Sequence, residues 1–198
     1  MHAIFHWVSL PRIPRYNNGG NEVDLGNASA GDGRFAISTK NAGGAKSREA
    51  MMPTNLIRTA HESLEKMKVK QLDIFYIHVP DRNMTLDEWM PSLQRLYEEG
   101  VFRRFGISNF TPDEVKELHD YCKQNGYVLP SVYQGNYNAV ARKAETILFP
   151  ILRELKMSFY AYSPLAGGFL AKSRQQITEG VGNGRWAKDP FSMMYQKL

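Results

Sequence analysis

The sequence has a single cysteine and no hydrophobic run long enough to cross a lipid bilayer. Cys122 has no second cysteine with which to form an internal disulfide, and this scarcity is typical of a reducing compartment, so we expect a cytoplasmic protein. The opening stretch MHAIFHWVSLPRIPR lacks the basic segment and the small-residue cleavage site of a signal peptide. We therefore expect neither a signal peptide nor contact with a membrane.

A strong charge of one sign is also missing. Lysine and arginine number 25 and aspartate and glutamate 20, which gives a net charge of +5 over 198 residues. Many basic residues have acidic neighbours, as in ESLEKMKVK and DEVKELHDYCK, a pattern typical of solvated helix faces. We therefore predict no nucleic-acid partner. A hydrophobic content of 42% is ordinary for a folded domain and predicts one domain over residues 1–198.

From residue 34 onward, strand-like and helix-like segments alternate. Strands are predicted over 34–40, 72–78, 101–110, 130–138 and 158–165, and helices over 53–69, 85–100, 111–126 and 141–157. Thr85 with Glu88 offers a capping box, and Thr111 offers an N-cap. Pro91 is predicted to kink its helix or to lower its stability, and Pro150 to mark a break or restart. This alternation is typical of βαβ crossovers, which build a parallel sheet.

The two ends of the chain differ from this pattern. Residues 16–33 are rich in glycine and asparagine and are predicted to be mostly loop. We divide the single domain into a divergent N-terminal segment (1–33), a core (34–170) and an irregular C-terminal segment (171–198) that ends in a possible helix.

Polar side chains stand at the carboxyl end of each predicted strand. They are Lys40, His78, Ser108 with Asn109, Gln134 with Asn136, and Tyr162 with Ser163. Each has an ordinary structural explanation, such as exposure, helix capping or turn formation. In a parallel sheet, however, these ends share one edge, where α/β proteins hold their ligands. The set as a whole therefore predicts a site.

The identities of these residues resemble those of the aldo-keto reductases, and most closely the aflatoxin-aldehyde reductase branch. The resemblance rests on ISTK, LDIFYIHVPD, RRFGISNF, SVYQGNYNAVARKAE and FYAYSPLAGG, in the family's order and spacing over about residues 34–185. It implies a (β/α)₈ barrel of the TIM type, here incomplete, with about strands three to seven clearly present. It also implies NADPH-dependent reduction of aldehydes or ketones to alcohols, without a metal.

The resemblance also implies roles for individual residues. Tyr16 corresponds to the proton donor, Lys40 to the lysine that lowers the pKa of that tyrosine, and His78 to the ring that holds the substrate carbonyl. The residues implied in cofactor binding are Ser108, Asn109, Gln134, Tyr162, Ser163, Leu165 and Gly167. Arg185, in GNGR, corresponds to an arginine that receives anionic substrates.

Two departures from the family pattern keep other functions open. Pro11 stands where the family has the aspartate that pairs with the lysine, and the family's first two strands and its eighth strand are not recognisable. The alternative is a catalytically impaired or inactive member that acts, if at all, as a binding or regulatory protein. A third class, a phosphate-binding isomerase or lyase barrel, explains polar strand ends but not their identities. Open strand edges would also favour self-association.

Overall fold

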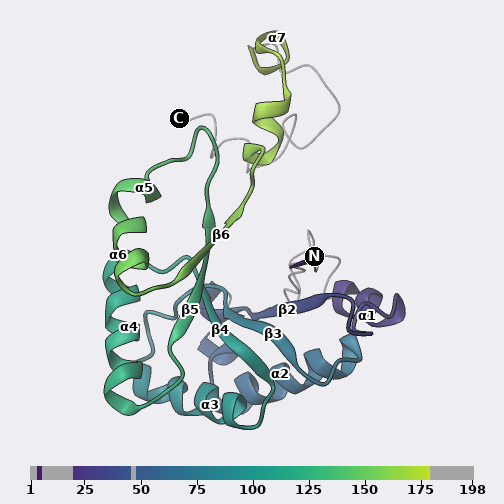
Figure 1. Cartoon of the computed structure of the whole chain (residues 1–198), viewed down its shortest axis with the longest axis vertical. Coiled ribbons are helices and arrows are strands. Elements are labelled where there is room, and N and C mark those ends of the chain that lie inside the picture. The colour runs from purple at the N-terminus through teal and green to yellow at the C-terminus, as the bar shows by residue number, and fades with distance from the viewer. Residues whose placement is uncertain (1–3, 6–19, 46–47, 179–198) are drawn as a thin grey trace.

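The computed structural model describes residues 4–5, 20–45 and 48–178 (Figure 1). Its strands form one parallel sheet whose order follows the sequence: β1 (Ile4–Phe5), β2 (Ala36–Asn41), β3 (Leu72–Ile77), β4 (Phe102–Ser108), β5 (Pro130–Asn136) and β6 (Ser158–Tyr162). The predicted strands after residue 33 are confirmed. The two-residue β1, which pairs with the start of β2, was not predicted.

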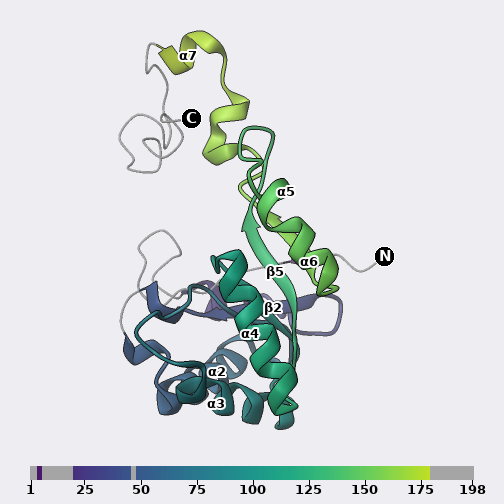
Figure 2. The same cartoon turned by 90° about the vertical axis from the view of Figure 1, so that its left-hand side faces the viewer.

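The connections between the strands are helical, as predicted. The α-helices are α1 (Gly20–Asn27), α2 (Pro53–Met67), α3 (Leu86–Glu98), α4 (Pro112–Asn125), α5 (Ala144–Ile147), α6 (Phe149–Glu154) and α7 (Arg174–Thr178). Short 3₁₀ turns η2 (Gly43–Ala45), η3 (Arg48–Ala50) and η4 (Ala166–Ala171) lie in the loops. Figures 1 and 2 show α2, α3, α4 and α6 outside the curve of the sheet, while η4 and α7 extend away from it.

The sheet is strongly curled. Strands β3 and β4 lie between β2 and β5, so a flat sheet would hold β2 and β5 about 14 Å apart, three strand spacings. Yet Lys40 of β2 donates a hydrogen bond to Gln134 of β5. Parallel strands, alternating helices on the outside and this curvature are consistent with an incomplete (β/α)₈ barrel, as expected.

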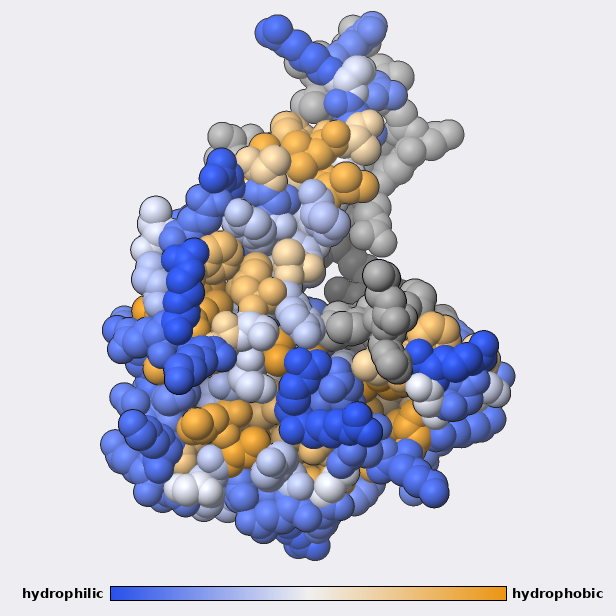
Figure 3. Space-filling model, viewed as in Figure 1, coloured by the Kyte–Doolittle hydropathy of each residue, from blue (hydrophilic) through white to orange (hydrophobic). Residues whose placement is uncertain are grey.

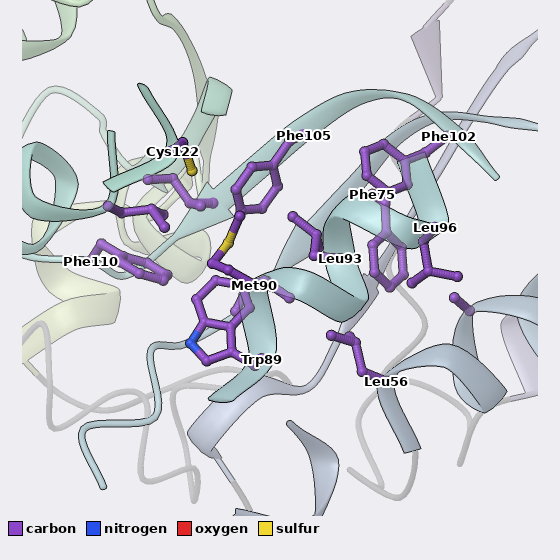
Figure 4. Packing of buried hydrophobic residues seen from close by; sticks show 14 of the residues in the cluster. Leu56, Phe75, Trp89, Met90, Leu93, Leu96, Phe102, Phe105, Phe110 and Cys122 are labelled. Atoms are coloured by element: carbon purple, nitrogen blue, oxygen red, sulfur yellow. The ribbon is translucent and has the colours of Figure 1, made fainter. Parts of the chain in front are cut away.

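The main core lies between the outer face of the sheet and the helices. Figure 4 shows the rings of Phe75, Phe102 and Phe105 together with Met90 and Leu93 of α3. The Phe75 and Phe102 rings stack with their centroids 5.7 Å apart. Each aromatic or leucine side chain buried in this way contributes about 1.5–3 kcal/mol to folding relative to exposure. This packing makes the strands a rigid support for the polar groups at their ends.

The loop predicted over residues 16–33 is wrong for residues 20–27, where α1 forms. The carboxylate of Glu22, only 3% exposed, accepts a hydrogen bond from the Thr39 hydroxyl at 2.8 Å. Lys66 Nζ of α2 lies 3.8 Å from the same carboxylate. Tertiary contacts with β2 and α2 therefore hold a helix that the glycine-rich sequence does not favour by itself.

The two internal prolines have different outcomes. Helix α3 continues through Pro91, where a kink was expected as one possibility. Pro91 and Asp87 are both exposed, so water can satisfy the carbonyl oxygen that loses its amide partner. Near Pro150 the predicted break is confirmed, because the segment divides into α5 and α6 at Leu148. The capping boxes at Thr85 and Thr111 are also confirmed.

Candidate active site

Register places the predicted site residues at one edge of the sheet. Lys40 pairs with Tyr76 on β3, Ser108 with Gln134 on β5, and Asn136 with Tyr162 on β6. His78 follows β3 directly, and its amide donates to the carbonyl oxygen of Asn41 at 3.0 Å. Residues separated by more than a hundred positions thus converge on the carboxyl ends of five strands, as the sequence predicted.

Among the predicted site residues, Lys40 carries its ammonium in a buried position. It is 8% exposed, and its ammonium donates to Gln134 Oε1 and lies 5.6 Å from the centre of the Tyr76 ring. The ring of Tyr76 leaves room only for glycine at position 106, where a Cβ would come within 2.3 Å of Tyr76 Cδ1. Burial lowers the pKa of Lys40 to about 8, because the charged form loses its hydration.

His78 is held uncharged at neutral pH. Burial, and then the positive charge of Lys40, lower the pKa of its imidazole to about 4. Its Nδ1 atom is buried and has no hydrogen-bond partner among the described residues. A neutral imidazole carries one N–H donor, which can hydrogen-bond a ligand oxygen at this edge. Lys40 and His78 are therefore electrostatically coupled neighbours on adjacent strands.

Asn109 connects three strand ends. It has a left-handed backbone with φ of 63°, and its Nδ2 donates to the carbonyl oxygen of His78 at 2.8 Å and to Ser108 Oγ at 3.0 Å. The Tyr162 hydroxyl donates to Asn109 Oδ1 at 3.4 Å. Ser108 is fully buried and Gln134 is 6% exposed. Asn109 thus links Ser108 and Tyr162 to the main chain at His78, while Gln134 is bonded to Lys40.

The remaining predicted positions lie along β6 and the segment that follows it. Ser163 has a φ of 56°, and its carbonyl oxygen accepts a hydrogen bond from Asn138 Nδ2 at 3.0 Å. Leu165 is 56% exposed, and Gly167 lies in η4 with a φ of 67°. Apolar colour covers this part of the face seen in Figure 3, where Leu165 and Leu170 are exposed. Ser163 directly follows β6, and Leu165 and Gly167 lie in the segment beyond it.

Two predicted residues, Tyr16 and Arg185, lie outside the described residues, as does Pro11. Sequence analysis missed Asn138, which bonds to Ser163 and to Asn136 Oδ1 and so ties the loop after β5 to the end of β6. Its position two residues after a strand-end asparagine, in NYN, was the available signal. Asn41 was also missed; its Oδ1 accepts from the Gly43 amide at 2.8 Å and orders the loop after β2.

A surface groove of about 700 Å³ lies elsewhere, between the loop after β3 and helices α3 and α4. Its charged lining is mainly acidic, with one arginine: Asp81, Arg82, Asp87, Glu114, Glu117 and Asp120. This lining would repel a phosphate-bearing dinucleotide. We therefore place the candidate site at the strand ends and not in this groove.

Among the described residues, no group of three or more histidine, cysteine, aspartate or glutamate side chains is arranged to hold a metal ion. Within the same ranges, every helix is too short or too polar to cross a membrane. Cys122 is buried in α4, as expected for a packing residue.

Comparison with known proteins assigns the pattern to a family. The model of the aldo/keto reductase family matches residues 14–196. The chain is 42% identical over 186 residues to the human aflatoxin B1 aldehyde reductase member 2, covering 87% of this chain and 51% of that protein. It is 38% identical over 187 residues to the oxidoreductase sirO of Leptosphaeria maculans, covering 93% and 55%. The chain spans about half the length of these curated relatives.

Proposed function

This chain belongs to the aldo/keto reductase family, and from that premise we propose that it reduces aldehydes or ketones to alcohols with NADPH. The observation that carries the proposal is the convergence of Lys40, His78 and Gln134 on one edge of the sheet. The relatives' names, an aldehyde reductase and an oxidoreductase, support the same class of reaction. We place the reaction in the cytoplasm, as the cysteine content favours.

The polar groups present fit a nicotinamide. Ser108 and Asn109 offer hydroxyl and amide groups, and Gln134 retains its Nε2 donor, because among the described residues only its Oε1 is engaged. In this proposal these three residues hold the carboxamide of the ring, and the half-exposed ring of Tyr162 stacks on it. Ser163, Leu165 and Gly167 line the pyrophosphate. NADPH, when bound, supplies the hydride.

Proton transfer and carbonyl orientation are assigned to three side chains. Tyr16 donates the proton to the developing alkoxide, and the ammonium of Lys40 favours the ionised phenol and so lowers the pKa of Tyr16. His78 donates a hydrogen bond from its neutral imidazole to the carbonyl oxygen. Arg185 receives an anionic group of the substrate. Rigid strand ends favour the close approach that such a reaction requires.

The direct test is NADPH oxidation in the presence of a simple aromatic aldehyde such as 4-nitrobenzaldehyde, followed by the loss of absorbance of the reduced nicotinamide. Tyr16→Phe, Lys40→Met and His78→Gln should each reduce kcat/KM by about 10²- to 10⁴-fold. Tyr97→Phe, which removes an exposed hydroxyl from α3, is the matched control and should leave the rate unchanged. Turnover by Tyr16→Phe at the parent rate would remove the assigned proton donor.

A second candidate function is dinucleotide binding without efficient catalysis. It is favoured by the partner of Lys40, which in the described chain is an amide oxygen and not a carboxylate. Isothermal titration with NADPH and with NADH separates the candidates. Micromolar binding of NADPH with no aldehyde turnover would support the binding protein. Binding of NADPH together with turnover would support the reductase, and weaker binding of NADH would establish the preference for the 2′-phosphate.

We also propose self-association through the edge of the sheet at β6. β6 ends the described sheet and pairs with β5 on one side. Unpaired strand edges can add a strand from another chain. Sedimentation velocity over about a hundredfold range of concentration would detect a dimer, and a single monomer boundary throughout would exclude it.

A further inference from the structure

The environment of Lys40 differs from that expected for a lysine paired with an acid. In the described part of the chain, the sole hydrogen-bond acceptor of its ammonium is Gln134 Oε1, and no carboxylate forms an ion pair with it. Position 11, where the family pattern has the pairing aspartate, is a proline. The two bonded side chains are 8% and 6% exposed, so both are largely removed from bulk solvent.

A neutral acceptor stabilises a buried ammonium less than a carboxylate does, because only a partial charge faces the cation. The lowered pKa of Lys40, about 8, is attributable to burial, with no opposing contribution from an acid in the described chain. The amide oxygen of Gln134 is then the group that favours the protonated form. Any change at Gln134 should therefore move the titration of Lys40.

We propose that Gln134 is the positioning residue of Lys40: its side-chain oxygen holds the ammonium at the strand ends and determines whether that amine is charged. Gln134 thereby acquires a role besides contact with a cofactor. The proposal deepens the proposed function, on which it rests for its catalytic meaning. The hydrogen bond itself joins two buried side chains from strands β2 and β5.

In the part of the chain that the structure describes, few other groups lie around Lys40. From β3, Tyr76 presents its ring to the ammonium and His78 is electrostatically coupled to it. From β4 and β5, the uncharged Ser108 and Gln134 complete the strand ends. Tyr76 and His78 are both neutral near pH 8, since burial raises the pKa of Tyr76 and lowers that of His78. The protonation of Lys40 near that pH therefore depends on burial and on Gln134.

The test is a pH titration of Lys40 in the full chain without cofactor or substrate. Side-chain ¹³Cε and ¹⁵Nζ resonances are followed by NMR, and Lys40 is assigned by the signal that Lys40→Met removes. The unmodified chain should titrate near pH 8. Gln134→Glu, which supplies a carboxylate, should raise the midpoint by about 1 to 3 pH units. Gln134→Met, of similar shape but without the acceptor, should lower it.

Gln124→Glu adds the same charge on α4, away from β2, and should leave the midpoint of Lys40 unchanged. Equal midpoints in the unmodified chain and in the folded Gln134 variants would overturn the proposal, and so would an unmodified midpoint near the ordinary 10.5. If one Gln134 variant does not fold, comparing the midpoint of Lys40 in the other variant with that in the unmodified chain still tests the proposal. Failure of NADPH binding or of turnover would overturn the proposed function and leave this titration intact.

Discussion

The side-chain amide of Asn109 donates a hydrogen bond to the main-chain oxygen of His78 at 2.8 Å, and so joins the ends of β3 and β4. The same amide contacts Ser108 and accepts from Tyr162. Three strand ends therefore depend on one side chain, in a left-handed conformation that asparagine tolerates better than most residues.

Replacing Asn109 should disturb both the proposed cofactor groups and His78. Asn109→Gly keeps the left-handed backbone but loses the hydrogen bonds, and we expect at least tenfold weaker NADPH binding by isothermal titration. Asn109→Ala loses the same bonds and adds about 1–2 kcal/mol of backbone strain, measurable by urea unfolding. If Asn109→Gly binds NADPH as the parent does, then this amide does not organise the site.

The loop after β2 should not accept a methyl group at Gly43. A Cβ there would lie 1.9 Å from the carbonyl oxygen of Val79, the residue after His78. Gly33→Ala is the matched control, because Gly33 also has positive φ but nothing lies within 4 Å of its Cβ position. We expect a loss of about 1–2 kcal/mol for Gly33→Ala and a clearly larger loss for Gly43→Ala in urea unfolding. Equal losses would contradict the close approach.

The buried pair Thr39 and Glu22 should be needed for α1. Thr39→Val removes the hydroxyl that donates to Glu22 at 2.8 Å and leaves a buried carboxylate short of a donor, at a cost of about 1–3 kcal/mol. Thr146→Val, at an exposed hydroxyl, should cost about 0.5 kcal/mol or less. Hydrogen exchange should show the loss of protection in residues 20–27 with the first variant and not with the second.

His78 should contribute to a loss of stability in acid. Its pKa is lowered from 6.5 to about 4 in the folded protein, so between these values the unfolded chain binds the additional proton. The stability that follows from the neutral ring is fully present above pH 6.5 and is lost as the pH falls toward 4. It amounts to at most about 3 kcal/mol, since the ring is partly accessible.

Urea unfolding at pH 7 and pH 4.5 measures this contribution. His78→Gln should lose less stability between the two pH values than the unmodified chain does. His61→Gln is the control, because His61 is exposed in α2, in the helical layer and not at the strand ends, and pairs with Glu99 at 3.1 Å. An unchanged difference for His78→Gln would show that the ring is not held neutral by its surroundings.

Much of the fold could be predicted because local signals agreed with tertiary structure. The run 72–78 is mostly apolar and buried, as expected for a strand inside a sheet covered by helices, and Thr111 with Gly126 marked both ends of α4. The loop prediction failed at α1. Glycine and asparagine there suggested a loop, but the contacts of Glu22 stabilise a helix. Sequence analysis also missed β1, since two residues carry too little pattern to be recognised.

The sequence by itself determined the alternation of strands and helices, and with it the side of the sheet on which Lys40, His78 and Gln134 would emerge, because parallel strands end at one edge. It could not determine which of those groups touch. The curvature of the sheet brings Lys40 to Gln134 across two intervening strands and leaves an amide as the described partner of its charge. Contacts between residues far apart in the chain depend on that packing, and no local pattern encodes them.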